Sequence, residues 1–272
     1  MDYIDRQSFV RFDSTKMVFA TLGWTFGPYL GIWLNGNFGP AVAYGFSMFW
    51  LAVLLVTFWY LRLSDSPVIQ PAARPPANPI KHIGRFISQP RLRLAWFIAF
   101  SRSAFWMTLF VFGPILMVDS GMGAEAGGLL LSIANFLLVT CYFWGRAAER
   151  RGVRPIIVTA FLGTAVALVV AGIGGEYSVW LAAGSLLVAA FFCSSLDAVG
   201  GVPFYRSVKR RERAQMTAVY RSYIDLGDLM PSLVYTVLLG VLGFGLEAVF
   251  IALACLHVVC ALVVWRYLPR SM

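Results

Sequence analysis

Five ionisable side chains lie inside long apolar stretches of the sequence: Arg102, Asp197, Arg221, Asp225 and Asp228. In the middle of a membrane span a charged side chain costs about 2.5–3.5 kcal/mol on insertion scales, so it usually faces a bundle interior or a wet cavity. The spacing of the last three predicts one helix face, on which Arg221 can pair with Asp225 while Asp228 lies deeper. These five residues are therefore candidates for a functional charge network.

The apolar stretches that hold these charges predict an all-α, polytopic membrane bundle of about eight transmembrane helices. Hydrophobic residues make up 59% of the 272 residues and charged residues 13%, against about 25% charged in a soluble domain. Runs of about 18 or more apolar residues are long enough to cross the hydrocarbon core as helices. The predicted spans are residues 17–34, 41–61, 94–118, 126–144, 155–175, 177–205, 216–242 and 248–265.

Basic residues alternate strictly between the gaps that separate these spans. Of the 22 Lys and Arg residues, all except Arg102 and Arg221 lie in the two tails or in every second gap. The positive-inside rule then places both termini in the cytoplasm, and we expect a multi-pass protein of a bacterial inner membrane, with the lipid bilayer as its surroundings. The same distribution explains the net charge of +9 without a nucleic-acid partner.

Enzyme chemistry and cofactors are not indicated by the reactive residue types. The four cysteines fall inside apolar runs, and the only two histidines are His82 and His257. No pair has metal-ligand spacing, and no nucleophile-base constellation or phosphate-binding glycine loop is present. We therefore predict no metal, no cofactor and no enzymatic activity.

The gap over residues 64–93 is much longer than the others. Residues 67–79 contain five prolines and predict an extended linker. Ile80, Ile83 and Ile87 then share one helix face, which predicts a short amphipathic helix at the cytoplasmic interface. We interpret the segment as a hinge between two bundles; the alternative is a loop without a special role.

Two short motifs stand out by the spacing of their residues: a glycine-proline repeat in the first span and a basic turn farther along the chain. Gly23, Gly27 and Gly31 recur every fourth residue around Pro28, which predicts a smooth helix face for close packing and a bend. A basic turn lies between the fourth and fifth spans, where Gly152 can reverse the chain and Glu149 can pair with arginines or cap a neighbouring helix. Its motif positions are Gly145, Glu149, Arg150, Gly152 and Arg154.

Together these features resemble the major facilitator superfamily of secondary transporters, in which two six-helix bundles are joined by a long cytoplasmic linker. The glycine-proline pattern is similar to the fifth-helix motif of exporters in that family, with Ile32 where a second glycine is usual. The basic turn is similar to the family's loop between helices eight and nine, with Glu149 for the usual aspartate and Val153 for a basic residue.

The resemblance aligns the spans with helices five to twelve of the family and leaves the first four without a counterpart. It implies a remnant of the N-terminal bundle over residues 1–63, the linker over 64–93 and a complete C-terminal six-helix bundle over 94–272. We expect a truncated or N-terminally incomplete transporter of a small molecule. A late start codon, a truncated gene or a chain that needs a partner are the alternatives, and a non-transporting scaffold or sensor is the alternative function.

The resemblance also implies that Arg102 and Asp197 lie on the cavity-lining helices seven and ten. We expect them to form a charge pair at the cytoplasmic end of the cavity, with Asp225 or Asp228 as a group that takes up the coupled proton. A static clasp between helices and a direct substrate contact are the alternatives. Asn135 and Trp106, with neighbouring aromatic residues, are candidates for lining a site for an amphipathic or aromatic substrate.

Overall fold

Helices form all the regular structure in the part of the chain that the structure describes. This computed structural model describes residues 9–61, 78–175, 177–209 and 212–269. The elements in chain order are α1 (Phe9–Phe38), α2 (Pro40–Leu61), α3 (Pro79–Ile87), α4 (Pro90–Asp119), α5 (Ala124–Phe136), η2 (Leu137–Thr140), α6 (Cys141–Arg151), α7 (Val153–Gly174), α8 (Val179–Val199), α9 (Val202–Ser207), α10 (Arg213–Tyr220), α11 (Ser222–Thr236), η4 (Val237–Val241) and α12 (Leu246–Tyr267).

Seven helical units among the described residues are long and apolar enough to cross a membrane. Three of them join shorter helices end to end: α5 with η2 and α6, α8 with α9, and α10 with α11 and η4. The first predicted span, residues 17–34, falls inside the 30-residue helix α1, which is not among the seven. The prediction of an all-α polytopic bundle is confirmed.

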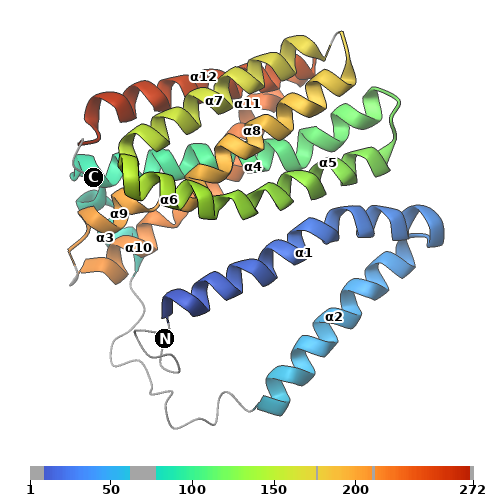
Figure 1. Ribbon diagram of the computed structural model, residues 1–272, viewed down its shortest axis with the longest axis horizontal. Coiled ribbons are helices and arrows are strands. Elements are labelled where there is room, and N and C mark those ends of the chain that lie inside the picture. The colour runs from blue at the N-terminus through green and yellow to red at the C-terminus, as the bar shows by residue number, and fades with distance from the viewer. Residues whose placement is uncertain (1–8, 62–77, 176, 210–211, 270–272) are drawn as a thin grey trace.

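The helices from α4 onward pack into one bundle with a shared apolar core (Figure 1). Helix α7 packs between α8 and α12, and α4 contacts α5, α8, α11 and α12. Helix α1 lies along α5, while α2 contacts α1 and buries none of its side chains. Because α4 also contacts α3 and α9, its polar side chains can link elements that are distant in sequence.

Close packing between α1 and α5 depends on a glycine of α5 and not on the glycine-proline motif of α1. A Cβ atom added to Gly128 would lie 3.2 Å from the Tyr29 Cα atom and 2.9 Å from the Ile32 side chain. The same atom added at Gly23, Gly27 or Gly31 would meet nothing within 4 Å among the described atoms. The motif glycines of α1 therefore face away from the helix that packs against it.

Pro28 lies inside α1 as predicted, and the backbone N–H group of the next residue forms a hydrogen bond with α5. The N–H group of Tyr29 donates a hydrogen bond to the Ser132 hydroxyl oxygen at 3.3 Å. A proline loosens the helix around it, because it lacks an N–H group and its ring crowds the preceding turn. This contact holds α1 and α5 together next to Gly128.

The second half of the predicted linker contains helix α3, whereas residues 62–77 lie outside the described part of the chain. The side chain of Asn78 caps α3 by accepting a hydrogen bond from the Ile80 N–H group at 3.0 Å. Phe86 is buried against α4 and α10, while Ile83 and Ile87 are exposed. Helix α3 therefore attaches to the bundle by one face and leaves an apolar edge open.

Candidate functional site

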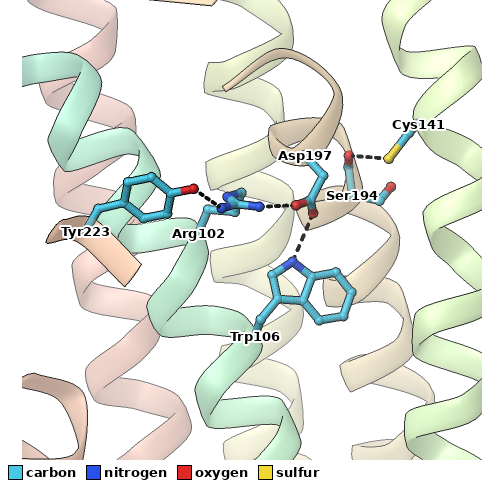
Figure 2. A network of polar contacts seen from close by, with 6 residues as sticks. All are labelled: Arg102, Trp106, Cys141, Ser194, Asp197 and Tyr223. Carbon is cyan, nitrogen blue, oxygen red and sulfur yellow. Dashed lines mark hydrogen bonds and ion pairs between the residues drawn. The ribbon is translucent and has the colours of Figure 1, made fainter. Parts of the chain in front are cut away.

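An ion pair between Arg102 of α4 and Asp197 of α8 forms the centre of the most connected polar network in the bundle (Figure 2). Trp106 lies one turn after Arg102 on the same face of α4 and donates its indole N–H to the second carboxylate oxygen of Asp197 at 2.9 Å. Both oxygens of Asp197 thus have donors from α4. The carboxylate fixes the relative position of the two helices.

Arg102 also reaches a third helix through Tyr223 of α11. Its Nη2 atom donates a hydrogen bond to the Tyr223 hydroxyl at 3.2 Å, and its Cζ atom lies 5.5 Å from the centre of the Tyr223 ring. A guanidinium group over an aromatic ring gains cation–π attraction in addition to the hydrogen bond. Arg102 therefore joins α8 to α11, with α4 between them (Figure 2).

The ion pair is largely withdrawn from solvent. The side chain of Arg102 is 23% exposed and that of Asp197 is 12% exposed. In such a site each charge depends on its partner, because removing one partner leaves an uncompensated charge at a cost of about 3–5 kcal/mol. The pair is consequently sensitive to any event that neutralises the carboxylate.

Several of the buried side chains of α8 are small. Ala189, Ala190 and Cys193 are completely buried on α8. Small residues at helix interfaces let backbones come together in membranes. The same helix is tied to η2 and α6 on its other side, where the Ser194 hydroxyl lies 2.7 Å from the Thr140 hydroxyl.

Helix α4 makes further polar contacts with α11 on either side of the ion pair. Toward its first turns, Trp96 donates its indole N–H to the Ser222 hydroxyl at 3.1 Å. Farther along, the hydroxyls of Thr108 and Tyr235 lie 2.9 Å apart. Arg102 thus occupies the middle of a line of contacts along the interface between α4 and α11.

Comparison with known proteins finds a family match for the second half of the chain. The family model described as Major Facilitator Superfamily matches residues 136–272, half of the chain, including Asp197 and Tyr223. The chain belongs to the Major Facilitator Superfamily. Members of this family are transporters, so the apolar helices and the family together make the chain a membrane transporter of that type. The search among curated proteins returned no match.

The other three charges of the predicted network lie away from the ion pair of this transporter. Arg221 lies between α10 and α11 and belongs to neither helix, and Asp225 and Asp228 on α11 are exposed. Among the described residues no ion pair joins Arg221 to Asp225, and their pairing stays a prediction. Both residues line a pocket of about 370 Å³ beside α3.

The two residues predicted to line a cavity, Asn135 and Trp106, lie in surroundings that differ from each other. Asn135 is buried on α5, where its side-chain amide donates to the Leu131 carbonyl oxygen of its own helix at 2.9 Å. Trp106 belongs to the ion-pair network. Of the neighbouring aromatic residues, Trp96 and Phe97 line a pocket of about 1120 Å³, whereas Phe105 is buried in the core.

The basic turn of this transporter reverses the chain between α6 and α7. Gly152 has φ 88° and ψ 158°, a conformation that is essentially restricted to glycine. Arg154 donates to the Trp265 carbonyl oxygen of α12 and its Cζ atom lies 4.9 Å from the centre of that indole ring. Glu149 and Arg150 are exposed, and neither forms an ion pair with a described residue. A Cβ atom added to Gly145 would meet no described atom within 4 Å.

Sequence reasoning did not identify Tyr223 as a member of the network, or Ser194 as a contact between α8 and η2. Tyr223 lies between Arg221 and Asp225, so a search for any polar side chain within the predicted spans would have included it. Ser194 lies three residues before Asp197 and meets the same criterion.

Proposed function

We propose that this transporter is a proton-coupled exporter of a small molecule and that the Arg102–Asp197 pair is its coupling switch. The observation that carries the proposal is the position of Arg102, which bridges α8 and α11 by contacting Asp197 and Tyr223 at once. Two helices held by one buried cation separate more readily when the anion that balances the cation is neutralised.

A proton that binds Asp197 removes the charge that holds Arg102. The neutral carboxyl keeps an acceptor for Trp106, but Arg102 must then turn to Tyr223, water or an anionic part of a substrate. Alternating access requires this kind of two-state contact between packed helices. Each Asp197 carries one proton, so the scheme couples one proton to each change of state.

Asp225 and Asp228 are secondary candidates as proton carriers. They are exposed on α11, the helix that Arg102 contacts through Tyr223. A carboxylate in that position can receive a proton from water and pass it toward the buried pair. Export is supported by the resemblance of the segment that contains Gly23, Gly27 and Pro28 to the exporter motif, and no residue constellation supports an enzymatic role.

Retention of ethidium, a cationic aromatic dye, by cells that express the chain tests the proposal. The wild type is expected to lower dye retention relative to empty cells, and a protonophore is expected to restore it. Asp197→Asn should abolish the effect, whereas Asp119→Asn, which changes an exposed carboxylate at the end of α4, should not. Equal dye retention in wild-type and Asp197→Asn cells would overturn the proposal.

We also propose that both termini lie in the cytoplasm of a bacterium and that the chain spans its inner membrane. The alternation of basic residues between gaps supports this orientation. Green fluorescent protein fused after residue 272 should be fluorescent, and alkaline phosphatase fused after Gly121 should be active. An inactive phosphatase together with a dark fluorescent fusion would show the opposite orientation.

A second candidate is a transporter subunit that works only with partner helices. It is favoured by α2, which contacts α1 and buries none of its 22 residues. If this is correct, the purified chain reconstituted alone should move no ethidium although it lowers dye retention in cells. Dye transport by the purified chain alone would exclude the subunit.

A further inference from the structure

A large apolar pocket lies at the end of the bundle where α3 meets the first turns of α4. Its volume is about 1120 Å³, and its walls come from α3, α4, α10, α11 and α12. Its apolar lining includes Leu94 and Phe97 of α4, Leu226 of α11 and Val263 of α12. Figure 1 shows α3, α9 and α10 at the end of the bundle where the C-terminus lies. The pocket thus opens at one end of the spans, next to Tyr267, the last residue of α12.

Two exposed arginines of α4, Arg91 and Arg93, belong to the lining of this otherwise apolar pocket. Neither forms an ion pair with a described residue, whereas Arg85 of α3 is paired with Glu212 at 2.5 Å. Cations in the first turn of a helix are repelled by the helix dipole, so they do not stabilise α4. Both arginines therefore lie at the pocket without an ion-pair partner among the described residues.

Helix α3 has the residue pattern of a helix that lies at a membrane interface. Ile83 and Ile87 of α3 line the pocket and remain exposed, whereas Phe86 is buried against α4. A short helix with one apolar and one basic face lies at the boundary between headgroups and acyl chains. Trp96 in the pocket wall is a residue type that is enriched at the same depth.

We infer that this pocket binds one anionic membrane phospholipid. An acyl chain occupies the apolar space between α4, α11 and α12, and the headgroup phosphate contacts Arg91 and Arg93. The apolar walls select a ligand with a hydrocarbon tail, and the two arginines select a negative headgroup, as basic pockets between transmembrane helices do. Bound lipid would fill the space between α3 and the bundle and stabilise the contact between them.

Native mass spectrometry of the full chain with dioleoyl phosphatidylglycerol tests the inference, and the zwitterionic dioleoyl phosphatidylcholine serves as reference. The wild type should prefer the anionic lipid. The variant R91Q/R93Q should lose the preference, with affinity falling about fivefold for each arginine removed. The matched variant R150Q/R151Q, which removes two exposed arginines at the end of α6, should retain it.

A second pair of variants tests the acyl-chain part of the pocket. Leu226→Trp narrows the pocket and should weaken binding of both lipids, whereas Val166→Trp on the exposed face of α7 should weaken neither. Excess glycerol 3-phosphate should not displace the bound phosphatidylglycerol, because it lacks the chain.

Four results would overturn the inference. The first is an unchanged lipid preference in R91Q/R93Q, and the second is an equal loss of preference in R150Q/R151Q. The third is full displacement by glycerol 3-phosphate, which would show a site for a soluble anion. Normal lipid binding by Leu226→Trp would likewise show that lipid is held by surface charge alone.

Discussion

The indole N–H of Trp106 donates a 2.9 Å hydrogen bond to the Asp197 carboxylate that also binds Arg102. Because Trp106 and Arg102 are four residues apart on α4, they approach the carboxylate from the same helix face. This arrangement orients Asp197 with two donors and leaves the far side of Arg102 for Tyr223. The network therefore transmits a change at one carboxylate to three helices.

Removal of the Trp106 indole N–H should lower the free energy of unfolding more than removal of the Trp96 indole N–H, which lies on the same helix. Trp106→Phe loses a hydrogen bond to a charged acceptor, worth about 1.5–3 kcal/mol. Trp96→Phe loses one to the neutral Ser222 hydroxyl, worth about 1 kcal/mol. Equilibrium unfolding in mixed micelles measures the free energy lost in each variant. Equal losses of free energy would mean that Asp197 does not carry a charge in the folded protein.

Neutralising one member of the ion pair should lower the free energy of unfolding more than neutralising both members. Arg102→Gln leaves Asp197 unbalanced and should lower the free energy of unfolding by about 3–5 kcal/mol. In the double variant R102Q/D197N no charge remains, and most of that loss should be recovered. Additive losses in the double variant would indicate that the two side chains act independently.

The packing of α1 on α5 should depend on glycine in α5 and not on glycine in α1. Gly128→Ala places a methyl group against the Tyr29 backbone and should cost about 1–3 kcal/mol, as overpacking does. Gly27→Ala has open space among the described residues and should change stability little. Hydrogen exchange of α1 would report the difference; faster exchange in Gly27→Ala than in Gly128→Ala contradicts this packing.

The turn between α6 and α7 should not tolerate a side chain at Gly152. Its φ of 88° with ψ of 158° is a backbone conformation that costs other residues about 1–3 kcal/mol. Gly152→Ala should therefore lower the unfolding temperature, whereas Gly145→Ala inside α6 should leave it unchanged or raise it slightly. A stable Gly152→Ala protein would show that the turn adopts another conformation.

Hydrophobicity and charge distribution were sufficient to predict the helical bundle, because span length and loop charge are properties of local sequence. The pairing of Arg102 with Asp197 was also predictable, because a buried charge requires a partner at a similar depth. The predicted pairing of Arg221 with Asp225 assumed a continuous helix, whereas Arg221 lies at the junction between α10 and α11. There the Ile224 N–H group bonds to the Arg221 carbonyl oxygen, three residues back, and the regular four-residue spacing is interrupted.

The position of neighbouring helices could not be obtained from local patterns. Gly23 and Gly27 predict a packing face, but their sequence does not determine which helix approaches them or from which side. The actual contact uses Gly128, whose neighbour Gly127 also packs closely against Pro114 of α4. Likewise, Trp106 was recognised only as an aromatic candidate, because its bond to Asp197 depends on how α4 and α8 are rotated.

Hydrogen exchange at a single pH can show whether Asp197 holds α8 in place. Asp197→Asn imitates the protonated carboxyl and should increase exchange in α8 and α11 at neutral pH. Asp119→Asn changes an exposed carboxylate and should leave exchange as in the wild type. An Asp197→Asn protein with wild-type exchange in both helices would mean that the ion pair does not restrain them.

Infrared difference spectroscopy tests the central claim most directly, because a protonated carboxyl has a C=O stretch that a carboxylate lacks. When the pH is lowered, the wild type should show the C=O band of a protonated carboxyl, together with faster hydrogen exchange in α8. The band should disappear in Asp197→Asn and remain in Asp119→Asn. A band that survives in Asp197→Asn and disappears in Asp225→Asn or Asp228→Asn would contradict the assignment of the switch to Asp197.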